Sequence, residues 1–67
     1  MKIMVNGDPM DLAGPVTLKA LLERLQVKPE LVVVEHNEKI LKREQLERTL
    51  VGENDNIEIV HFVGGGI

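Results

Sequence analysis

The sequence lacks the residues that most often carry covalent or metal chemistry. Its 67 residues include no cysteine and no serine, so a disulfide or thiolate metal site is excluded, and Thr17 and Thr49 supply the only aliphatic hydroxyls. Tryptophan and tyrosine are also absent, and Phe62 is the single aromatic residue, which disfavours stacking on nucleic-acid bases. The net charge of −3 disfavours a polyanionic partner. We therefore expect no catalytic site, no metal, no other cofactor and no bound nucleic acid.

Long hydrophobic runs are absent as well. No apolar run approaches the roughly 20 residues that span a membrane. Residues 1–6 show neither the apolar stretch nor the cleavage site of a secretory signal. We therefore expect a cytoplasmic chain that does not enter a membrane. Its length suits one domain, whose core has to come from leucine, valine and isoleucine.

The beginning of the chain predicts a hairpin. Residues 2–6 alternate polar and apolar side chains, which favours a strand. Asn6-Gly7 is typical of a type I′ hairpin turn, because both residues accept a positive φ. Pro9 limits the second strand to about residues 10–12 and places it at a sheet edge, because proline has no N–H to donate.

One convincing helix follows, over about residues 18–26. Thr17 is a plausible N-cap, and Pro29 lies beyond the helix end. The apolar face is formed by leucines at i, i+3, i+4 and i+7, namely Leu18, Leu21, Leu22 and Leu25.

The second half of the chain predicts further strands. Residues 31–37 form an apolar run with little alternation at its start, which is typical of a central strand covered on both faces. Asn37-Glu38 is predicted to turn the chain, and Ile40 and Leu41 to return to the body of the domain. The remaining elements are a helical turn over residues 42–47 anchored by Leu46, a strand over residues 49–51, a turn over residues 52–56 and the last strand from Ile57.

This order of elements indicates an α+β domain. We expect a mixed sheet of four or five strands with one face packed on the main helix. The first and last strands are expected to be parallel neighbours at its centre. We predict a domain over residues 1–63, followed by a flexible glycine tail over residues 64–67.

The last strand carries the first candidate site. Alternation puts Ile57 and Ile59 on one face and Val60 and Phe62 on the other. If the isoleucines face the helix, Val60 and Phe62 lie on the open face of the sheet. An exposed aromatic residue beside the tail then suits the anchor of a partner-binding surface. Burial of Phe62 in the core remains the alternative.

The glycine tail carries the second candidate site. Gly64, Gly65 and Gly66 end the strand, because glycine loses the most backbone freedom on ordering. Extended, the tail spans about 13 Å at about 3.3 Å per residue. A segment without Cβ atoms enters a slot too narrow for other residue types and presents a main-chain carboxylate at its end. A frayed terminus without a role remains the alternative.

Other polar residues predict no site of their own. His36 and His61 have no third ligand at a recognisable spacing, which argues against a metal pair. The acidic side chains are dense and no cleft-forming architecture accompanies them, so they are interpreted as a solvated surface: Glu35, Glu38, Glu44 and Glu47.

Four segments carry a resemblance to a known family. They are Val5-Asn6-Gly7, the leucine-rich helix, the stretch VVVEHN at residues 32–37 and the stretch DNIEIVHFVGGG at residues 55–66. In these segments the chain resembles the sulfur carrier proteins of thiamine biosynthesis, small ubiquitin-like β-grasp domains that end in Gly-Gly. The last segment is the most specific. It looks more like the thiamine carriers than the small subunits of molybdopterin synthase, which share the fold.

The resemblance implies a protein substrate and not an enzyme. A ubiquitin-activating-type adenylyltransferase would use ATP to adenylate the terminal glycine carboxylate, here that of Gly66. A sulfur donor, a cysteine desulfurase or similar, would displace AMP and leave a thiocarboxylate. Thiazole synthase would then accept the sulfur. The narrow tail suits a closed site that keeps water from the reactive intermediate.

Ile67 departs from this pattern, because the family ends at the second glycine of its motif. Either Ile67 is removed before use, or the chain is an inactive precursor, or the resemblance overstates the function. The alternatives are a carrier for molybdopterin or another pathway, a ubiquitin-like modifier, and a β-grasp interaction module without carrier chemistry.

Overall fold

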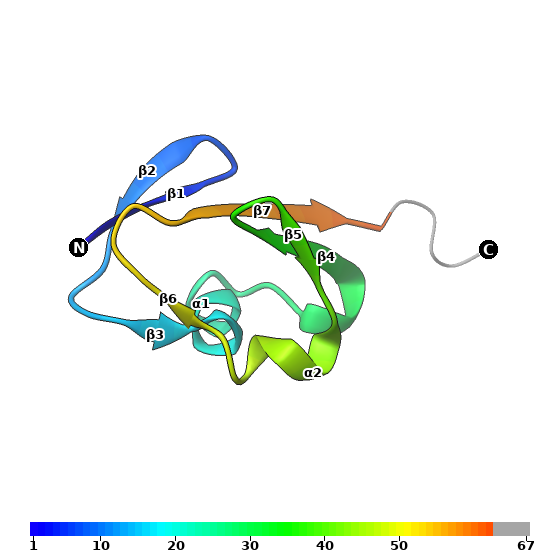
Figure 1. Ribbon diagram of the computed structural model, residues 1–67. Coiled ribbons are helices and arrows are strands. Elements are labelled where there is room, and N and C mark those ends of the chain that lie inside the picture. The colour runs from blue at the N-terminus through cyan, green and yellow to red at the C-terminus, as the bar shows by residue number, and fades with distance from the viewer. Residues whose placement is uncertain (63–67) are drawn as a thin grey trace.

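A five-stranded sheet with two helices on one side makes up the part of the chain that the computed structural model describes, residues 1–62 (Figure 1). The main sheet has the order β2-β1-β7-β4-β5, and β3 and β6 form a separate two-stranded sheet. The elements are β1 (Lys2–Val5), β2 (Asp8–Asp11), β3 (Val16–Thr17), α1 (Leu18–Arg24), η1 (Pro29–Leu31), β4 (Val32–His36), β5 (Lys39–Leu41), α2 (Arg43–Leu46), β6 (Leu50–Val51) and β7 (Asn56–His61).

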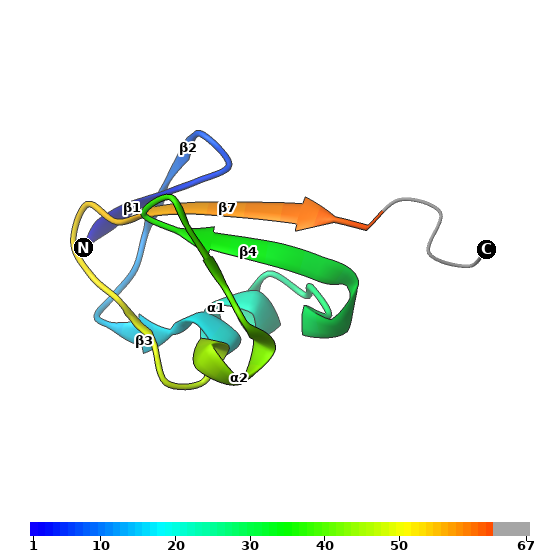
Figure 2. The same cartoon turned by 45° about the vertical axis from the view of Figure 1, so that its right-hand side comes forward.

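The first and last strands are parallel neighbours, as predicted. Met4 pairs with Asn56 and Val5 with Ile57. Every other pairing is antiparallel within the described residues, so the sheet is mixed. Figure 2 shows β7 running between β1 and β4, the two strands that it joins into one sheet. The predicted α+β class and the mixed sheet on one main helix are confirmed.

The first hairpin turns at Asn6 and Gly7, whose φ angles of 49° and 84° confirm the predicted turn. β2 begins at Asp8, so the expected strand over residues 10–12 was placed too late. A two-residue turn lets pairing resume at once, and Pro9 pairs with Met4. Pro9 is tolerated there because β2 is an edge strand, with no neighbour on its outer side to require an N–H.

α1 starts and ends through local hydrogen bonds. The backbone N–H of Ala20 donates to Thr17 Oγ1 at 3.1 Å, which confirms Thr17 as the N-cap. The helix ends at Arg24 rather than Gln26, because Gln26 adopts a left-handed φ of 61°. The Val27 N–H then donates to the Leu22 carbonyl at 2.9 Å, which is the wide bond of a Schellman motif.

The core lies between the sheet and the helices. It consists of Ile3, Leu12, Leu18, Leu21, Leu22, Val32, Val34, Leu46, Val51, Ile57 and Ile59. These side chains come from the helix-facing sides of the strands and the leucine face of α1, as the periodicity predicted, and Leu46 anchors α2.

Two expectations about burial were wrong. β4 is covered on one face only: Val32 and Val34 are buried, but Val33 between them is only partly so. Ile40 does not return to the core and remains 69% exposed. It pairs with Glu35 of β4, and paired residues share a face, so Ile40 points to the side without helices.

No helix among residues 1–62 is long and apolar enough to cross a membrane.

Candidate functional site

Val60 of β7 and Phe62, the residue after His61 at the end of β7, are both exposed. Ile57 and Ile59 are buried, whereas Val60 and Phe62 are each 55% exposed. This is the alternation expected of a strand with one covered face. The core placement of Phe62 is therefore wrong. Val60 lies on the open face, as predicted, and Phe62 is exposed just beyond the end of β7. The partner-binding role of the two residues stays a prediction.

Phe62 also borders a shallow apolar groove. The groove has a volume of about 230 Å³ and is lined by Phe62 together with residues of η1, β4, β5 and α2, namely Pro29, Val32, Val33, Val34, Ile40, Leu41, Arg43 and Leu46. The backbone holds Phe62 in place here, because its N–H donates to the Leu31 carbonyl at 2.9 Å. The exposed ring of Phe62 thus belongs to a surface that several elements form together.

The side chain of Asn6 fixes the path of β7. Its Nδ2 donates to the Ile59 carbonyl at 3.3 Å, and the Ile59 N–H donates to its Oδ1 at 2.7 Å. The Asn6 N–H also donates to the Ile57 carbonyl at 2.8 Å. Asn6 therefore extends the β1–β7 ladder beyond Val5, where β1 ends. The sequence identified Asn6 as a turn residue but missed this second role.

A hydrogen-bonded cluster around Asp55 holds the start of β7. His36 Nε2 donates to Asp55 Oδ2 at 2.7 Å, and the Gly52 N–H donates to the same oxygen at 2.7 Å. Asn37 Nδ2 donates to Oδ1 at 3.1 Å. Partial burial raises the pKa of Asp55, but the bonds from Gly52, His36 and Asn37 outweigh it, and the pKa lies below its ordinary value. The cluster joins the β4–β5 turn to the loop before β7.

The two histidines lie at opposite ends of the β4–β7 ladder. His36 pairs with Ile57, and His61 pairs with Val32. The two positions are four residue steps apart along the ladder, which is about 13 Å at about 3.3 Å per residue. Within residues 1–62, no group of three or more His, Asp or Glu side chains is arranged to hold a metal ion.

The predicted tail site, Gly64, Gly65, Gly66 and Ile67, lies outside the described residues, as does the expected domain boundary after residue 63. β7 ends at His61, and the described chain ends one residue later, at Phe62. The open face of β7 is therefore the described surface next to the tail in sequence.

Comparison with known proteins decides the family. The sequence model of the ThiS family matches residues 3–66. The chain belongs to the ThiS family. A crystal structure of the thiamine biosynthesis protein ThiS from Geobacter metallireducens superposes on this ThiS-family chain with a TM-score of 0.86, at 38% identity, covering 98% of this chain and 100% of that one. The predicted ubiquitin-like β-grasp fold and the family resemblance are thereby confirmed.

Two curated relatives of this ThiS-family chain differ in length. The sulfur carrier protein ThiS of Bacillus subtilis is 42% identical over 50 residues, which are 75% of this chain and 76% of that protein. A protein of Magnetococcus marinus named thiazole synthase is 42% identical over 66 residues, which are 98% of this chain. The chain spans only 20% of the length of that second relative.

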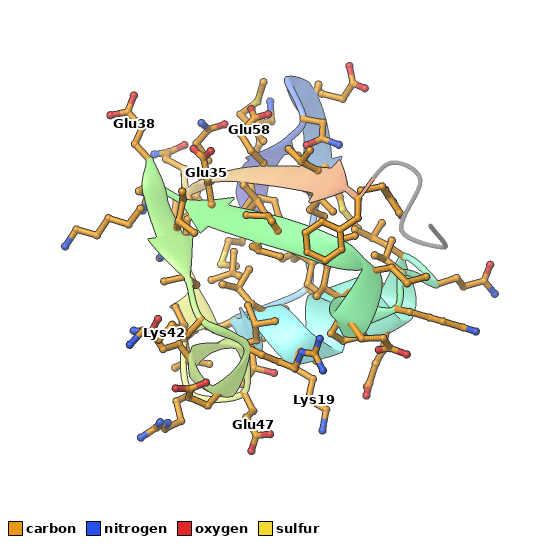
Figure 3. The ribbon with its side chains drawn as sticks, turned by 90° about the vertical axis from the view of Figure 1, so that its right-hand side faces the viewer. Lys19, Glu35, Glu38, Lys42, Glu47 and Glu58 are labelled. Carbon is orange, nitrogen blue, oxygen red and sulfur yellow. The ribbon has the colours of Figure 1, made fainter. Side chains whose placement is uncertain are left out.

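The structure of this ThiS-family chain also brings together residues that the sequence did not associate. Glu35 of β4 lies directly opposite Glu58 of β7. Figure 3 shows Glu35, Glu58 and Glu38 on the side of the sheet away from the helices, with Lys19, Lys42 and Glu47 on the helix side. Alternation along each strand indicates which face each glutamate occupies. The sequence does not indicate the register that places the two glutamates opposite each other.

Proposed function

We propose that this chain is a sulfur carrier of thiamine biosynthesis and that it carries its sulfur as a thiocarboxylate on Gly66. A carboxylate oxygen of Gly66 attacks the α-phosphorus of ATP, pyrophosphate leaves, and an acyl adenylate remains. The chemistry requires this step, because a free carboxylate is a poor acyl donor until its oxygen belongs to a leaving group. A sulfide equivalent from a donor such as a cysteine desulfurase then attacks the carbonyl carbon and releases AMP.

The chain in this proposal is a substrate for two enzymes in turn. A ubiquitin-activating-type adenylyltransferase binds it and adenylates the tail, and thiazole synthase then accepts the sulfur. The relative named thiazole synthase supports the second partner, because a region similar to this chain makes up a fifth of that protein. We propose Val60 and Phe62 as the contact residues, and their exposure beside the tail is the observation that carries this assignment.

Ile67 sets a condition on the mechanism. The side chain of Ile67 is branched at Cβ, and a slot shaped for glycine excludes it. We therefore propose that Ile67 is removed before Gly66 is activated. Gly64 and Gly65 then act as the narrow connection between β7 and the reactive end. Intact mass spectrometry of the chain isolated from its own cells tests both steps: loss of Ile67, and a gain of about 16 Da where sulfur has replaced oxygen.

ATP–pyrophosphate exchange tests the activation step directly. Full-length chain, chain without Ile67, and the shortened chain with Gly66→Ala are compared with the adenylyltransferase of the same organism. We expect exchange to be fastest with the shortened chain and suppressed by Gly66→Ala, since the added methyl meets a site shaped for none. Equal exchange in all three overturns the slot. If none of the three chains supports exchange while a known carrier does so with the same enzyme, the chain is assigned to the interaction modules.

A further inference from the structure

Two carboxylates of like charge oppose each other on the open face of the sheet. Glu35 and Glu58 form a cross-strand pair between β4 and β7, and both side chains are half-buried. Directly opposed residues of an antiparallel pair have Cβ atoms about 4.5–5.5 Å apart, and like charges there are destabilising. Stability of the isolated domain therefore does not account for this pair.

No cation of the described chain neutralises the pair. The one salt bridge recorded within residues 1–62 joins His36 and Asp55 at the end of the ladder. On the other side of Glu35 the paired residue is Ile40, which is apolar. Lys39 adjoins Ile40, and alternation directs it to the opposite face of β5. The row Ile40–Glu35–Glu58 thus carries two negative charges with no positive charge in it.

Apolar side chains continue from this row toward the end of β7. Val33 pairs with Val60 in the next row of the same face. Phe62 follows two residues beyond Val60 and is equally exposed. We call this surface the acidic–apolar face, defined as Val33, Glu35, Ile40, Glu58, Val60 and Phe62.

We propose that the acidic–apolar face binds a protein surface on which an arginine side chain lies among apolar side chains. The guanidinium group is placed between Glu35 and Glu58, and the apolar groups pack on Val60 and Phe62. Arginine fits better than lysine, because its planar group donates in a fixed fork to carboxylates and is more weakly hydrated. This inference rests on the proposed function, which supplies the bearer of that surface, the adenylyltransferase.

Other occupants of the face are disfavoured by its charge. A second copy of the chain, placed on the same face by two-fold symmetry, would bring four carboxylates together. Nucleic acid and an anionic membrane carry the same sign of charge as the pair and are repelled. A basic protein surface instead relieves the repulsion between the two carboxylates. Because this repulsion destabilises the unbound domain, its relief favours binding.

Charge-neutral variants test the proposal. Glu35→Gln and Glu58→Gln, singly and together, remove charge with little change in shape, and Glu47→Gln on the helix side is the matched control for each single variant, with the same change of one unit in net charge (Figure 3). The dissociation constant of each full-length chain for the purified adenylyltransferase is measured by calorimetry over a series of salt concentrations. Urea unfolding is measured in parallel.

We expect the double variant to bind about tenfold or more weakly, and its dissociation constant to lose its dependence on salt. The reason is that complementary charges at an interface raise both the affinity and the rate of association. Glu47→Gln should bind within about twofold of the parent chain, which removes net charge as the explanation. The double variant should be at least as stable as the parent, since it relieves a like-charged pair. Weaker binding together with retained stability is the pattern that supports the face.

Other outcomes overturn the proposal. Binding by the double variant equal to that of Glu47→Gln overturns the acidic–apolar face while leaving tail activation intact, as pyrophosphate exchange would show. Tighter binding by the double variant would mean that an acidic surface docks there. Concentration-dependent dimers in sedimentation, abolished by Phe62→Ala, would assign the face to a second copy. No binding by the parent chain overturns the inference, and pyrophosphate exchange with the same enzyme then shows whether the proposed activation fails as well.

Discussion

The side-chain amide of Asn6 donates to the Ile59 carbonyl and accepts from the Ile59 N–H, 53 residues further along the sequence. The amide takes the place of the backbone groups that a longer β1 would have offered to β7. Asn6 does this from the hairpin turn, where its φ is 49°. One side chain thus both closes the first hairpin and fixes the parallel register of the central strands.

Asn6→Gly separates these two roles. Glycine keeps the positive φ of the turn but loses both bonds to Ile59, and we expect the free energy of unfolding to fall by about 1–2 kcal/mol. Asn6→Asp keeps the acceptor but sets a carboxylate against the Ile59 carbonyl, so its loss should shrink when the carboxylate is protonated at low pH. Urea unfolding at two pH values measures both. An unchanged stability for Asn6→Gly would contradict the role of the amide.

The two hairpin turns make a second comparison. Both have two residues at positive φ, Asn6-Gly7 in the first and Asn37-Glu38 in the second, where Glu38 has a φ of 72°. Because a left-handed conformation strains a residue with a Cβ, Glu38→Gly should stabilise the protein by about 0.5–1 kcal/mol. Gly7→Ala should destabilise it by about 1 kcal/mol through φ alone, since the space around Gly7 is open. Thermal unfolding of both variants would show opposite shifts, and shifts of the same sign would refute the argument.

Replacement of Leu22 and of Phe62 should separate core from surface. Leu22 is fully buried, so Leu22→Ala is expected to cost about 2–5 kcal/mol, enough to unfold much of so small a domain. Phe62→Ala should change stability by only about 0.5 kcal/mol while weakening binding to the adenylyltransferase. Denaturation and calorimetry are run on the same preparations. Comparable losses of stability in the two variants would place Phe62 with the core.

Acid unfolding should report on Asp55. Its pKa in the folded protein lies below the ordinary value of 3.8, so its contribution to stability is complete above that pH. As the pH falls below 3.8 and through the folded pKa, protonation removes the negative charge that strengthens the hydrogen bonds from His36, Asn37 and the Gly52 N–H, and stability falls. Asp55→Asn should lower stability at neutral pH and flatten this decline. Asp8→Asn, at an exposed position, is the matched control, and an equal flattening by both would exclude the Asp55 cluster as the cause.

Local chemistry made much of the fold predictable. Leucine spacing located α1, Thr17 its start, and Asn6-Gly7 the first turn, because each signal lies within a few residues of its effect. Ile40 shows the limit of such signals. It adjoins Leu41, both are apolar, and only pairing with β4 decides which of the two faces the core.

The candidate site was predictable to the same extent. Val60 and Phe62 followed from alternation along β7, which needs one strand alone. The opposition of Glu35 and Glu58 and the reach of Asn6 to Ile59 depend on how separate strands align. That alignment arises from tertiary packing, and no short-range pattern encodes it.

The position of β7 at the centre of the sheet has a consequence for synthesis on the ribosome. Within residues 1–62, the β1–β2 and β4–β5 hairpins are joined into one sheet only by β7, the last of the described strands in the sequence. Until β7 has left the exit tunnel, two separate hairpins and a helix have no common sheet to join. A chain interrupted before residue 56 lacks the strand that joins the two hairpins, so we expect it to be more open to proteolysis than the complete domain.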